Sequence, residues 1–207
     1  GKRAVEVWHR RAGKDLFAIN LISTKIPERV GLYWHMLPTY KQGRAIVWNG
    51  ATRDGRAFLD HFHPDLVTNT NATEMRKTFY NGAIYQVVGT DNVNSLVGTN
   101  PIGVVFSEYS LHDPAAWNLI RPILLENGGW ALFIYTARGR NHGYTMLKMA
   151  GKNPRWHCEV LKAGDSGTSK EDGSPVFSDM MIDEERVTGM PEEMVQQEYF
   201  CSFDAPF

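Results

Sequence analysis

Short apolar runs alternate with amphipathic stretches along the chain. Apolar runs bounded by turn residues predict strands at residues 4–7, 30–37, 66–70, 76–80, 83–89, 102–106, 130–135 and 156–161. Apolar residues at helical spacing predict helices at residues 16–23, 39–61, 114–125, 141–150, 179–187 and 191–200. Strands that alternate with helices are typical of βαβ units. We therefore expect an α/β fold in which helices flank a mainly parallel central sheet.

Local signals add detail to this outline. Residues 102–106 and 130–135 are almost continuously apolar, which indicates strands buried on both faces of the sheet. Asn81-Gly82 separates two strand candidates and predicts a hairpin turn. The helix at residues 39–61 should break near Gly50 or Gly55. Residues 91–98 should form a loop or one helical turn, and the Gly/Ser-rich residues 163–174 a mobile loop.

Composition limits the classes of protein that fit this outline. The chain has 207 residues, of which 43% are hydrophobic, so we expect one domain with a sizeable core. It contains no apolar run of about 18 residues, so we expect neither a membrane-spanning helix nor a membrane partner. Cys158 and Cys201 form no Cys-x-x-Cys motif, which argues against structural zinc or a disulfide framework and favours a reducing, intracellular setting. The net charge of −1 means that nucleic acid would need a local basic patch.

The junction between the first strand and the first helix carries the first candidate site. A Gly-Lys pair at such a junction is typical of a phosphate-binding loop, because backbone N–H groups, the helix N-terminus and the lysine all present positive charge. The loop usually reads G-x-x-x-x-G-K-[ST], but here Trp8 replaces the first glycine and Asp15 replaces the hydroxyl residue. An ordinary strand-to-helix turn is the alternative interpretation. The candidate nucleotide-binding residues are His9, Arg10, Arg11, Ala12, Gly13, Lys14 and Asp15.

The second candidate site follows the apolar strand at residues 102–106. Magnesium-dependent nucleotide motors place two acidic residues at the end of such a strand. The first helps to hold the metal and the second, a glutamate, polarises the attacking water. The corresponding residues here are Ser107 and Glu108. A strand that merely ends in a polar pair is the alternative interpretation.

The two departures from the usual motifs complement each other. Asp15 stands where a hydroxyl is expected and Ser107 stands where a carboxylate is expected, and these positions face each other across Mg²⁺ in phosphate-loop enzymes. One hydroxyl and one carboxylate are therefore still present, in exchanged places. Mg²⁺ accepts hard oxygen ligands in either arrangement. We expect Asp15 to bind Mg²⁺ directly or through water, and Ser107 to hydrogen-bond to Asp15 or to a metal-bound water.

Further motifs give the chain a family resemblance. They are Pro38-Thr39-Tyr40-Lys41-Gln42, Gly89-Thr90-Asp91-Asn92 with Leu96 and Gly98, Trp117, Arg121-Pro122, residues 134–142 and the closing residues 197–203. In this order and spacing, and together with the phosphate loop and Glu108, they resemble the ATPase domain of the large terminase subunit. This protein is the DNA-packaging motor of tailed bacteriophages. The resemblance covers nearly the whole chain.

The resemblance implies a RecA-like phosphate-loop NTPase of the ASCE type that binds ATP and Mg²⁺. Lys14 would contact the β- and γ-phosphates, and Glu108 would be the catalytic carboxylate. Thr136 would match the coupling motif, where it senses the γ-phosphate at the end of its strand. Arg10 or Arg11 matches an arginine that is often found in this family's phosphate loop.

The resemblance also implies an assembly. A homo-oligomeric ring in the host cytoplasm would dock transiently on the portal protein of a viral procapsid, interact with the small terminase subunit and move double-stranded DNA. Residues 1–150 would form the ATPase core. Residues 151–207 would form the C-terminal part of the ATPase domain, a linker to a nuclease domain that lies downstream of this chain. The abrupt start and end of the chain fit a part of a larger protein.

Two expectations about basic residues are less specific. The family often has Leu-Arg-Gly before the metal-binding strand, and that arginine is a candidate to reach the neighbouring subunit's ATP. The triplet here is Leu96-Val97-Gly98, so a trans-acting arginine must come from elsewhere. The candidates are Arg121, Arg138 and Arg140, and possible contacts to the DNA backbone are Lys41 and Arg44. Ordinary surface or ion-paired side chains are the alternative in each case.

Two other functions stay open on the sequence. A helicase-like remodeller of nucleic acid also fits Pro38-Thr39, although it would need a second RecA-like domain. A degenerate nucleotide-binding scaffold without turnover fits the altered loop. The presence of both Lys14 and Glu108 favours an active ATPase over the scaffold.

Overall fold

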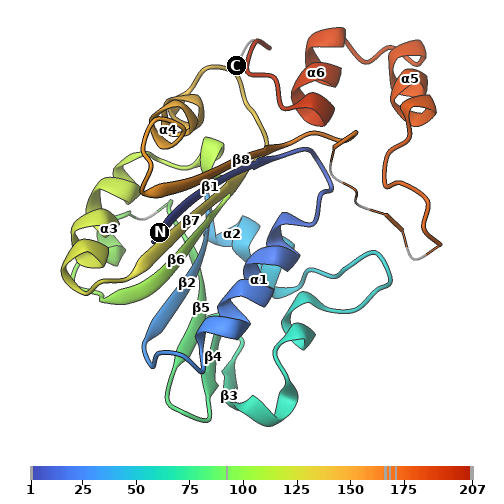
Figure 1. Ribbon diagram of the computed structural model, residues 1–207. Helices are drawn as coiled ribbons and strands as arrows, with labels where there is room; N and C mark the ends of the chain where they lie inside the picture. The colour runs from blue at the N-terminus through green and yellow to red at the C-terminus, as the bar shows by residue number, and fades with distance from the viewer. Residues whose placement is uncertain (1, 92, 166, 168, 171, 206–207) are drawn as a thin grey trace.

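An eight-stranded sheet forms the centre of the molecule in the computed structural model, which describes residues 2–91, 93–165, 167, 169–170 and 172–205 (Figure 1). Its strands are β1 (Arg3–Trp8), β2 (Leu32–Leu37), β3 (Val67–Asn71), β4 (Arg76–Phe79), β5 (Ile84–Gly89), β6 (Pro101–Ser107), β7 (Trp130–Tyr135) and β8 (Trp156–Leu161). The strand order is β3-β4-β5-β2-β6-β7-β1-β8. Neighbours from β5 to β8 pair in parallel, whereas β3 and β4 form an antiparallel extension.

Helices cover both faces of this sheet. α1 (Lys14–Lys25) lies on one face, and α3 (Ala115–Glu126) and α4 (His142–Ala150) lie on the other (Figure 1). α5 (Asp179–Val187) and α6 (Glu192–Phe200) form a separate pair beyond the ends of β1 and β8 (Figure 1). The short helical turns are α2 (Tyr40–Gln42), η1 (Gly43–Trp48), η2 (Phe58–His61), η3 (Pro64–Leu66), η4 (Val93–Leu96) and η5 (Tyr109–Leu111).

The two faces of the sheet carry two hydrophobic cores because successive strand residues point to opposite sides. In β6, Val104 and Phe106 join the core beneath α3 and α4, whereas Val105 joins the core beneath α1. All seven residues of β6 are buried, which explains its continuous apolar sequence. Burying one such side chain contributes about 1.5–3 kcal/mol, so the central strands form a firm base for the loops at their ends.

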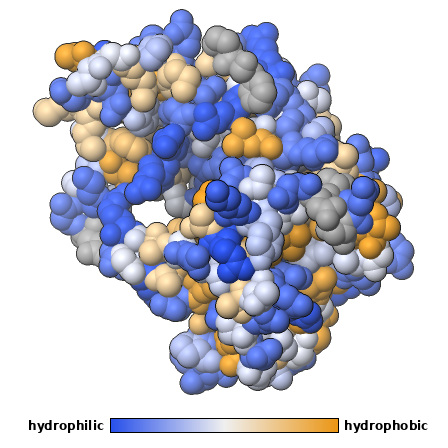
Figure 2. Space-filling view, turned by 180° about the vertical axis from the view of Figure 1, so that it is seen from behind, coloured by the Kyte–Doolittle hydropathy of each residue, from blue (hydrophilic) through white to orange (hydrophobic). Residues whose placement is uncertain are grey.

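A smaller third core lies between α5 and α6. It contains Ile182 of α5 and Val195 and Tyr199 of α6. The surface outside these cores is largely polar. Figure 2 shows the reverse face of the molecule, where hydrophilic side chains predominate and hydrophobic ones are scattered in small groups. Among the described residues, no helix has both the length and the apolar character needed to cross a bilayer.

The structure confirms the predicted fold class and most of the predicted elements. β7, β8 and α5 have the predicted bounds. Asn81-Gly82 forms the predicted turn, in which Gly82 has φ +86° and its N–H donates to the Phe79 carbonyl at 2.9 Å. η4 supplies the single helical turn expected within residues 91–98, although Asn92 lies outside the described residues.

The helix predicted at residues 39–61 is wrong over most of its length. Only α2 and the π-helical turn η1 form, and the chain then runs irregularly to η2. The Asn49 N–H donates to the Arg44 carbonyl at 2.9 Å, a five-residue spacing that ends the helical ladder. At Gly50 the backbone passes so close to the Ile46 carbonyl that any Cβ would collide with it. Glycine permits a tight exit here, and the apolar residues beyond it reach the core from a loop.

Two further expectations concern the C-terminal third. β8 adds to the same sheet beside β1, although it follows residue 150, the predicted end of the ATPase core. The boundary itself stays a prediction. The loop predicted at residues 163–174 lies partly outside the described residues, at 166, 168 and 171. Near its end, the Lys170 N–H donates to the Ser174 carbonyl at 2.7 Å.

Candidate nucleotide site

The predicted site residues gather where three parallel strands end side by side. β7 lies between β6 and β1, so the carboxyl ends of all three strands share one edge of the sheet. Open α/β sheets bind ligands at this edge. The candidate phosphate loop follows β1, Ser107 ends β6, and Thr136 follows β7.

Two backbone hydrogen bonds hold the start of the loop after β1. The His9 N–H donates to the Leu161 carbonyl at 2.9 Å, and the Arg10 N–H donates to the Glu198 carbonyl at 2.8 Å. Arg11 and Gly13 both have left-handed backbones, with φ of +64° and +82°. The left-handed turn at Gly13 lets the chain enter α1 directly, and glycine adopts that conformation at little cost.

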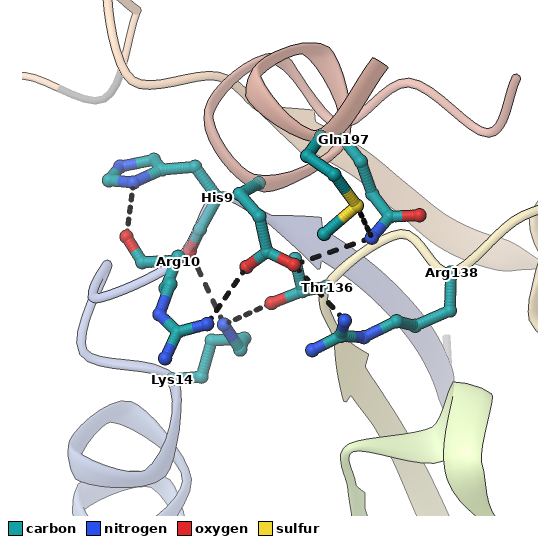
Figure 3. Close-up of polar contacts among 8 residues, drawn as sticks. His9, Arg10, Lys14, Thr136, Arg138 and Gln197 are labelled. Carbon is teal, nitrogen blue, oxygen red and sulfur yellow. Dashed lines mark hydrogen bonds and ion pairs between the residues drawn. The ribbon is translucent and has the colours of Figure 1, made fainter. Parts of the chain in front are cut away.

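Lys14 is directed into the site by two hydrogen bonds. Its Nζ donates to Thr136 Oγ1 at 2.9 Å and to the His9 carbonyl at 3.3 Å (Figure 3). The side chain is only 7% exposed. Two of the three predicted catalytic residues, Lys14 and Thr136, are therefore in direct contact although they are 122 positions apart. Their catalytic roles stay predictions.

Asp15 and Ser107 also meet. Ser107 Oγ donates a hydrogen bond to Asp15 Oδ1 at 2.5 Å, and Ser107 is fully buried. This is the contact that the exchange of hydroxyl and carboxylate predicts. Whether the pair binds Mg²⁺ stays a prediction, but one carboxylate and one hydroxyl do lie together beside Lys14.

Glu108 follows immediately in an unusual backbone conformation. Its φ of +57° and ψ of 42° lie in the left-handed region, which non-glycine residues adopt rarely and which is enriched at functional sites. Burial raises the pKa of the Glu108 carboxyl, and the positive charges of Lys14 and Arg138 only partly oppose this shift. A carboxyl with a raised pKa is suited to accept a proton from water.

His35 was not among the predicted site residues; it lies on β2 and is completely buried. Its Nε2 is 3.2 Å from Asp15 Oδ1, and its Nδ1 is 3.1 Å from the hydroxyl of Tyr85 on β5. Burial acts to raise the pKa of Asp15, but the hydrogen bonds from His35 and Ser107 outweigh it and lower the pKa. The only signal in the sequence was a polar residue within the apolar run at residues 30–37.

Glu198 of α6 was also missed as a charged partner, although it lies in one of the motifs that suggested the family. Its Oε2 is 3.3 Å from Arg10 Nη1, and its Oε1 is 3.1 Å from Arg138 Nη1. The carboxylate is almost fully buried between the two guanidinium groups, whose side chains approach from opposite sides of the site in Figure 3. Gln197 accepts a hydrogen bond from the Gly139 N–H at 3.3 Å, which adds a second link from α6 to the segment after β7.

Trp8, which replaces the usual first glycine, has a clear structural role. Its indole Nε1 lies 3.2 Å from both Glu6 Oε2 and Glu159 Oε2, so one N–H bridges two carboxylates on neighbouring strands. Its ring packs against Phe17 of α1 at a centroid distance of 5.1 Å. Because Trp8 is the last residue of β1, its side chain lies with the strand and not in the loop.

The remaining predicted basic residues are either paired within this chain or exposed. Arg138 pairs with Glu198 in its own chain, Arg140 pairs with Asp204 at 2.7 Å, and Arg121 is exposed on α3. Lys41 is exposed. Arg44 donates to the carbonyls of residues 72 and 73, each at 3.0 Å. None of these positions tests a trans-acting or DNA-binding role, which stays a prediction for each residue.

Comparisons with known proteins give different results for the sequence and for the structure. No protein-family model and no curated protein matches the chain by sequence. Solved structures do match. The ATPase domain of the large terminase of Thermus phage P74-26 is 18% identical with a TM-score of 0.78, and the match covers 98% of this chain and 88% of that one.

Nucleotide complexes are among the matches. The large terminase of the thermophilic bacteriophage D6E in complex with ADP is 13% identical with a TM-score of 0.70. The same protein in complex with ATP-γ-S is 13% identical with a TM-score of 0.68. Each match covers 98% of this chain and 48% of the D6E chain. The chain therefore has the RecA-like fold of the ATPase domain of phage large terminases.

Proposed function

We propose that this chain is the ATPase domain of a phage large terminase and that it hydrolyses ATP to move double-stranded DNA. The main support is the assembly of Lys14, Thr136, Glu108 and the Asp15–Ser107 pair at one edge of a sheet. The fold is shared with a terminase that has been solved with ADP and with ATP-γ-S.

The residues divide the chemistry of phosphoryl transfer among them. The backbone of the loop after β1 and the N-terminus of α1 cradle the phosphates, and the Lys14 ammonium places a full positive charge on the β- and γ-phosphates. Glu108 holds the attacking water and draws off its proton. Thr136 touches Lys14, so a change at the γ-phosphate passes directly to the segment after β7.

The donor groups beside the loop fit Mg²⁺. The pKa of Asp15 is lowered, because the hydrogen bonds from His35 and Ser107 outweigh the effect of burial, so the carboxylate is ionised. Its neighbour Ser107 offers a hydroxyl, and both are the hard oxygen donors that Mg²⁺ prefers. Bound Mg²⁺ would neutralise charge on the β- and γ-phosphate oxygens.

The proposed partners follow from the proposed family. They are a ring of identical subunits, a portal protein on a viral procapsid, a small terminase subunit and DNA. A motor must grip any DNA sequence, so contacts to the phosphate backbone without base recognition are expected. Lys41 is exposed and Arg44 is half-buried, and both are candidates for such contacts.

ATP turnover by the full-length protein tests the proposal. We expect hydrolysis that DNA stimulates, and a loss of about 10²–10⁴-fold in Glu108→Gln because a positioned general base contributes that much. Lys14→Ala should also lose nucleotide binding. Glu126→Gln, an exposed glutamate at the end of α3, is the matched control and should retain the wild-type rate.

The outcome also separates the alternatives. No turnover with DNA, or full turnover in Glu108→Gln, would overturn the proposed ATPase. Nucleotide binding without turnover would favour the scaffold. Strand separation on a tailed duplex would favour the helicase-like remodeller over the packaging motor.

A further inference from the structure

A buried chain of polar side chains leads to Asp15 from the core of the sheet. Tyr85 on β5, His35 on β2 and Asp15 at the start of α1 follow one another at distances of 3.1 and 3.2 Å. Tyr85 and His35 are both completely buried. Buried polar groups without partners cost free energy, so a chain like this persists only when each group is satisfied.

The directions of these hydrogen bonds follow from the two residues on either side of His35, which are Asp15 and Tyr85. Oδ1 of Asp15 accepts a hydrogen bond from Ser107 and lies within hydrogen-bond distance of His35 Nε2, so a proton on Nε2 lets His35 donate to it. Burial raises the pKa of Tyr85 well above its usual value, so its neutral hydroxyl can donate to His35 Nδ1. An imidazole with its proton on Nε2 donates to Asp15 and leaves Nδ1 to accept from Tyr85, which satisfies both contacts.

The two oxygens of the Asp15 carboxylate have different environments. Oδ1 accepts from both His35 Nε2 and Ser107 Oγ. Within the part of the chain that the structure describes, Oδ2 makes no hydrogen bond, and the Asp15 side chain is 16% exposed. One oxygen is therefore fixed by the protein, and the other has no protein partner among the described residues.

We propose that His35, supported by Tyr85, is a positioning residue that orients the Asp15 carboxylate to bind the magnesium ion of Mg-ATP. This inference rests on the proposed function. It also accounts for a carboxylate at a loop position where other enzymes have a hydroxyl. A hydroxyl needs no second support, whereas a carboxylate beside phosphates must be held so that it meets the metal and not the phosphate oxygens.

Nucleotide binding with and without Mg²⁺ tests the role of His35. The quantity measured is the ratio of the Kd of a fluorescent, non-hydrolysable ATP analogue in EDTA to its Kd in Mg²⁺. Outer hydrogen-bond partners of metal ligands typically change metal affinity by about 10–100-fold, so His35→Leu should lose about that much of the ratio. His35→Gln, whose amide N–H can replace Nε2–H, should restore most of it. Tyr85→Phe should lose a smaller part.

Tyr33→Phe is the matched control. Tyr33 is also buried, lies two residues before His35 on β2, and donates to the backbone carbonyls of Lys25 and Arg29 at 2.9 and 2.5 Å. Its loss should lower the Tm without changing the Mg²⁺ ratio. A His35→Leu protein that folds and keeps the wild-type ratio, while Asp15→Asn loses it, would overturn the role of His35 and leave the proposed function standing. If Asp15→Asn also keeps the wild-type ratio, Asp15 does not bind the metal. The proposed role of His35 and the proposed metal-binding role of Asp15 then both fail.

A second readout does not depend on nucleotide. In the metal-free protein at pH 7.5, the ¹⁵N shifts of the imidazole should show a protonated Nε2 and an unprotonated Nδ1 at His35. In Tyr85→Phe the Nδ1 shift should move while that of Nε2 stays. The opposite tautomer in the wild-type protein would contradict the proposal, because Nε2 could not then donate to Asp15.

Discussion

At the scale of single residues, the site holds two carboxyl groups in contrasting environments. Burial acts on Asp15 as well as on Glu108, but only Asp15 receives hydrogen bonds from His35 and Ser107 that outweigh it and lower the pKa. For Glu108 the effect of burial prevails, so the pKa of its carboxyl group is raised. Neighbouring groups whose pKa values are pushed apart are typical of a divided acid–base task. The lowered group suits a cation ligand, and the raised group suits the attack by water.

The exchange of Asp15 and Ser107 leads to a double-mutant prediction. Asp15→Ser alone should lower magnesium-dependent hydrolysis because it removes the anionic ligand, and Ser107→Asp alone should lower it because two like charges then meet. The double variant restores one hydroxyl and one carboxylate and should recover part of the rate. Steady-state ATPase assays across Mg²⁺ concentrations measure this, and a double variant no better than the worse single variant would exclude compensation.

At the scale of elements, the pairing of β1 with β8 places acidic side chains opposite each other. Glu6 and Glu159 are register partners on the two strands. Burial, together with the hydrogen bond and negative charge of Glu159, raises the pKa of Glu6 to about 8, while the Trp8 indole partly opposes the shift. His157 lies 3.3 Å from the same carboxyl group. The Trp8 N–H bridges the two carboxyl groups, and the raised pKa of Glu6 keeps a proton on that residue over a wider range of pH.

This arrangement predicts a pH-dependent stability. Between the ordinary pKa of 4.5 and the folded pKa of about 8, the folded chain keeps a proton on Glu6 that the unfolded chain has released. The free energy of unfolding should therefore fall as pH rises through this window. Glu6→Gln should remove that slope and be more stable than the wild type at pH 8.5 but not at pH 4.5, as urea denaturation would show. Equal slopes in both proteins would show that Glu6 does not retain this proton in the folded chain.

The elements also show how much of the fold and of the candidate site could be predicted from the sequence. β6 and β7 were readable because strands buried on both faces are continuously apolar. The helix predicted at residues 39–61 breaks near Gly50 as expected, but it does not resume beyond that point, and its apolar spacing could not show this. Lys14, Asp15 and Ser107 were found through local motifs. His35 could not be found in this way, because its role depends on the strand order, which brings β2 beside both β5 and β6.

At the scale of the whole molecule, α6 is tied to the nucleotide site by charge. Glu198 contacts Arg10 from the loop after β1 and Arg138 from the segment after β7. These are the two segments that also carry Lys14 and Thr136. The helical pair α5–α6 has its own small core, so its attachment to the rest of the molecule depends strongly on such contacts.

Glu198→Gln should loosen this attachment. The amide keeps the shape but not the charge, and loss of a charged partner in a buried position should cost about 1–3 kcal/mol. We expect faster hydrogen exchange in α6 and, because two guanidinium groups lose their counter-charge, tighter binding of nucleotide phosphates. Asp204→Asn, which breaks the exposed pair with Arg140, is the control and should change little. Unchanged exchange in α6 would show that Glu198 does not hold the helix.

The hydrogen-bonded pair of Asp15 and Ser107 also constrains how such a site could arise by single substitutions. An ancestor with a loop hydroxyl and a strand carboxylate can change either position first. Changing the strand first leaves two hydroxyls and no anionic ligand, which forfeits most of the attraction for a divalent cation. Changing the loop first leaves two carboxylates, which repel each other but still hold the cation. On the proposed metal role, the second route loses less function than the first, and related motors with acidic residues at both positions are the expected intermediates.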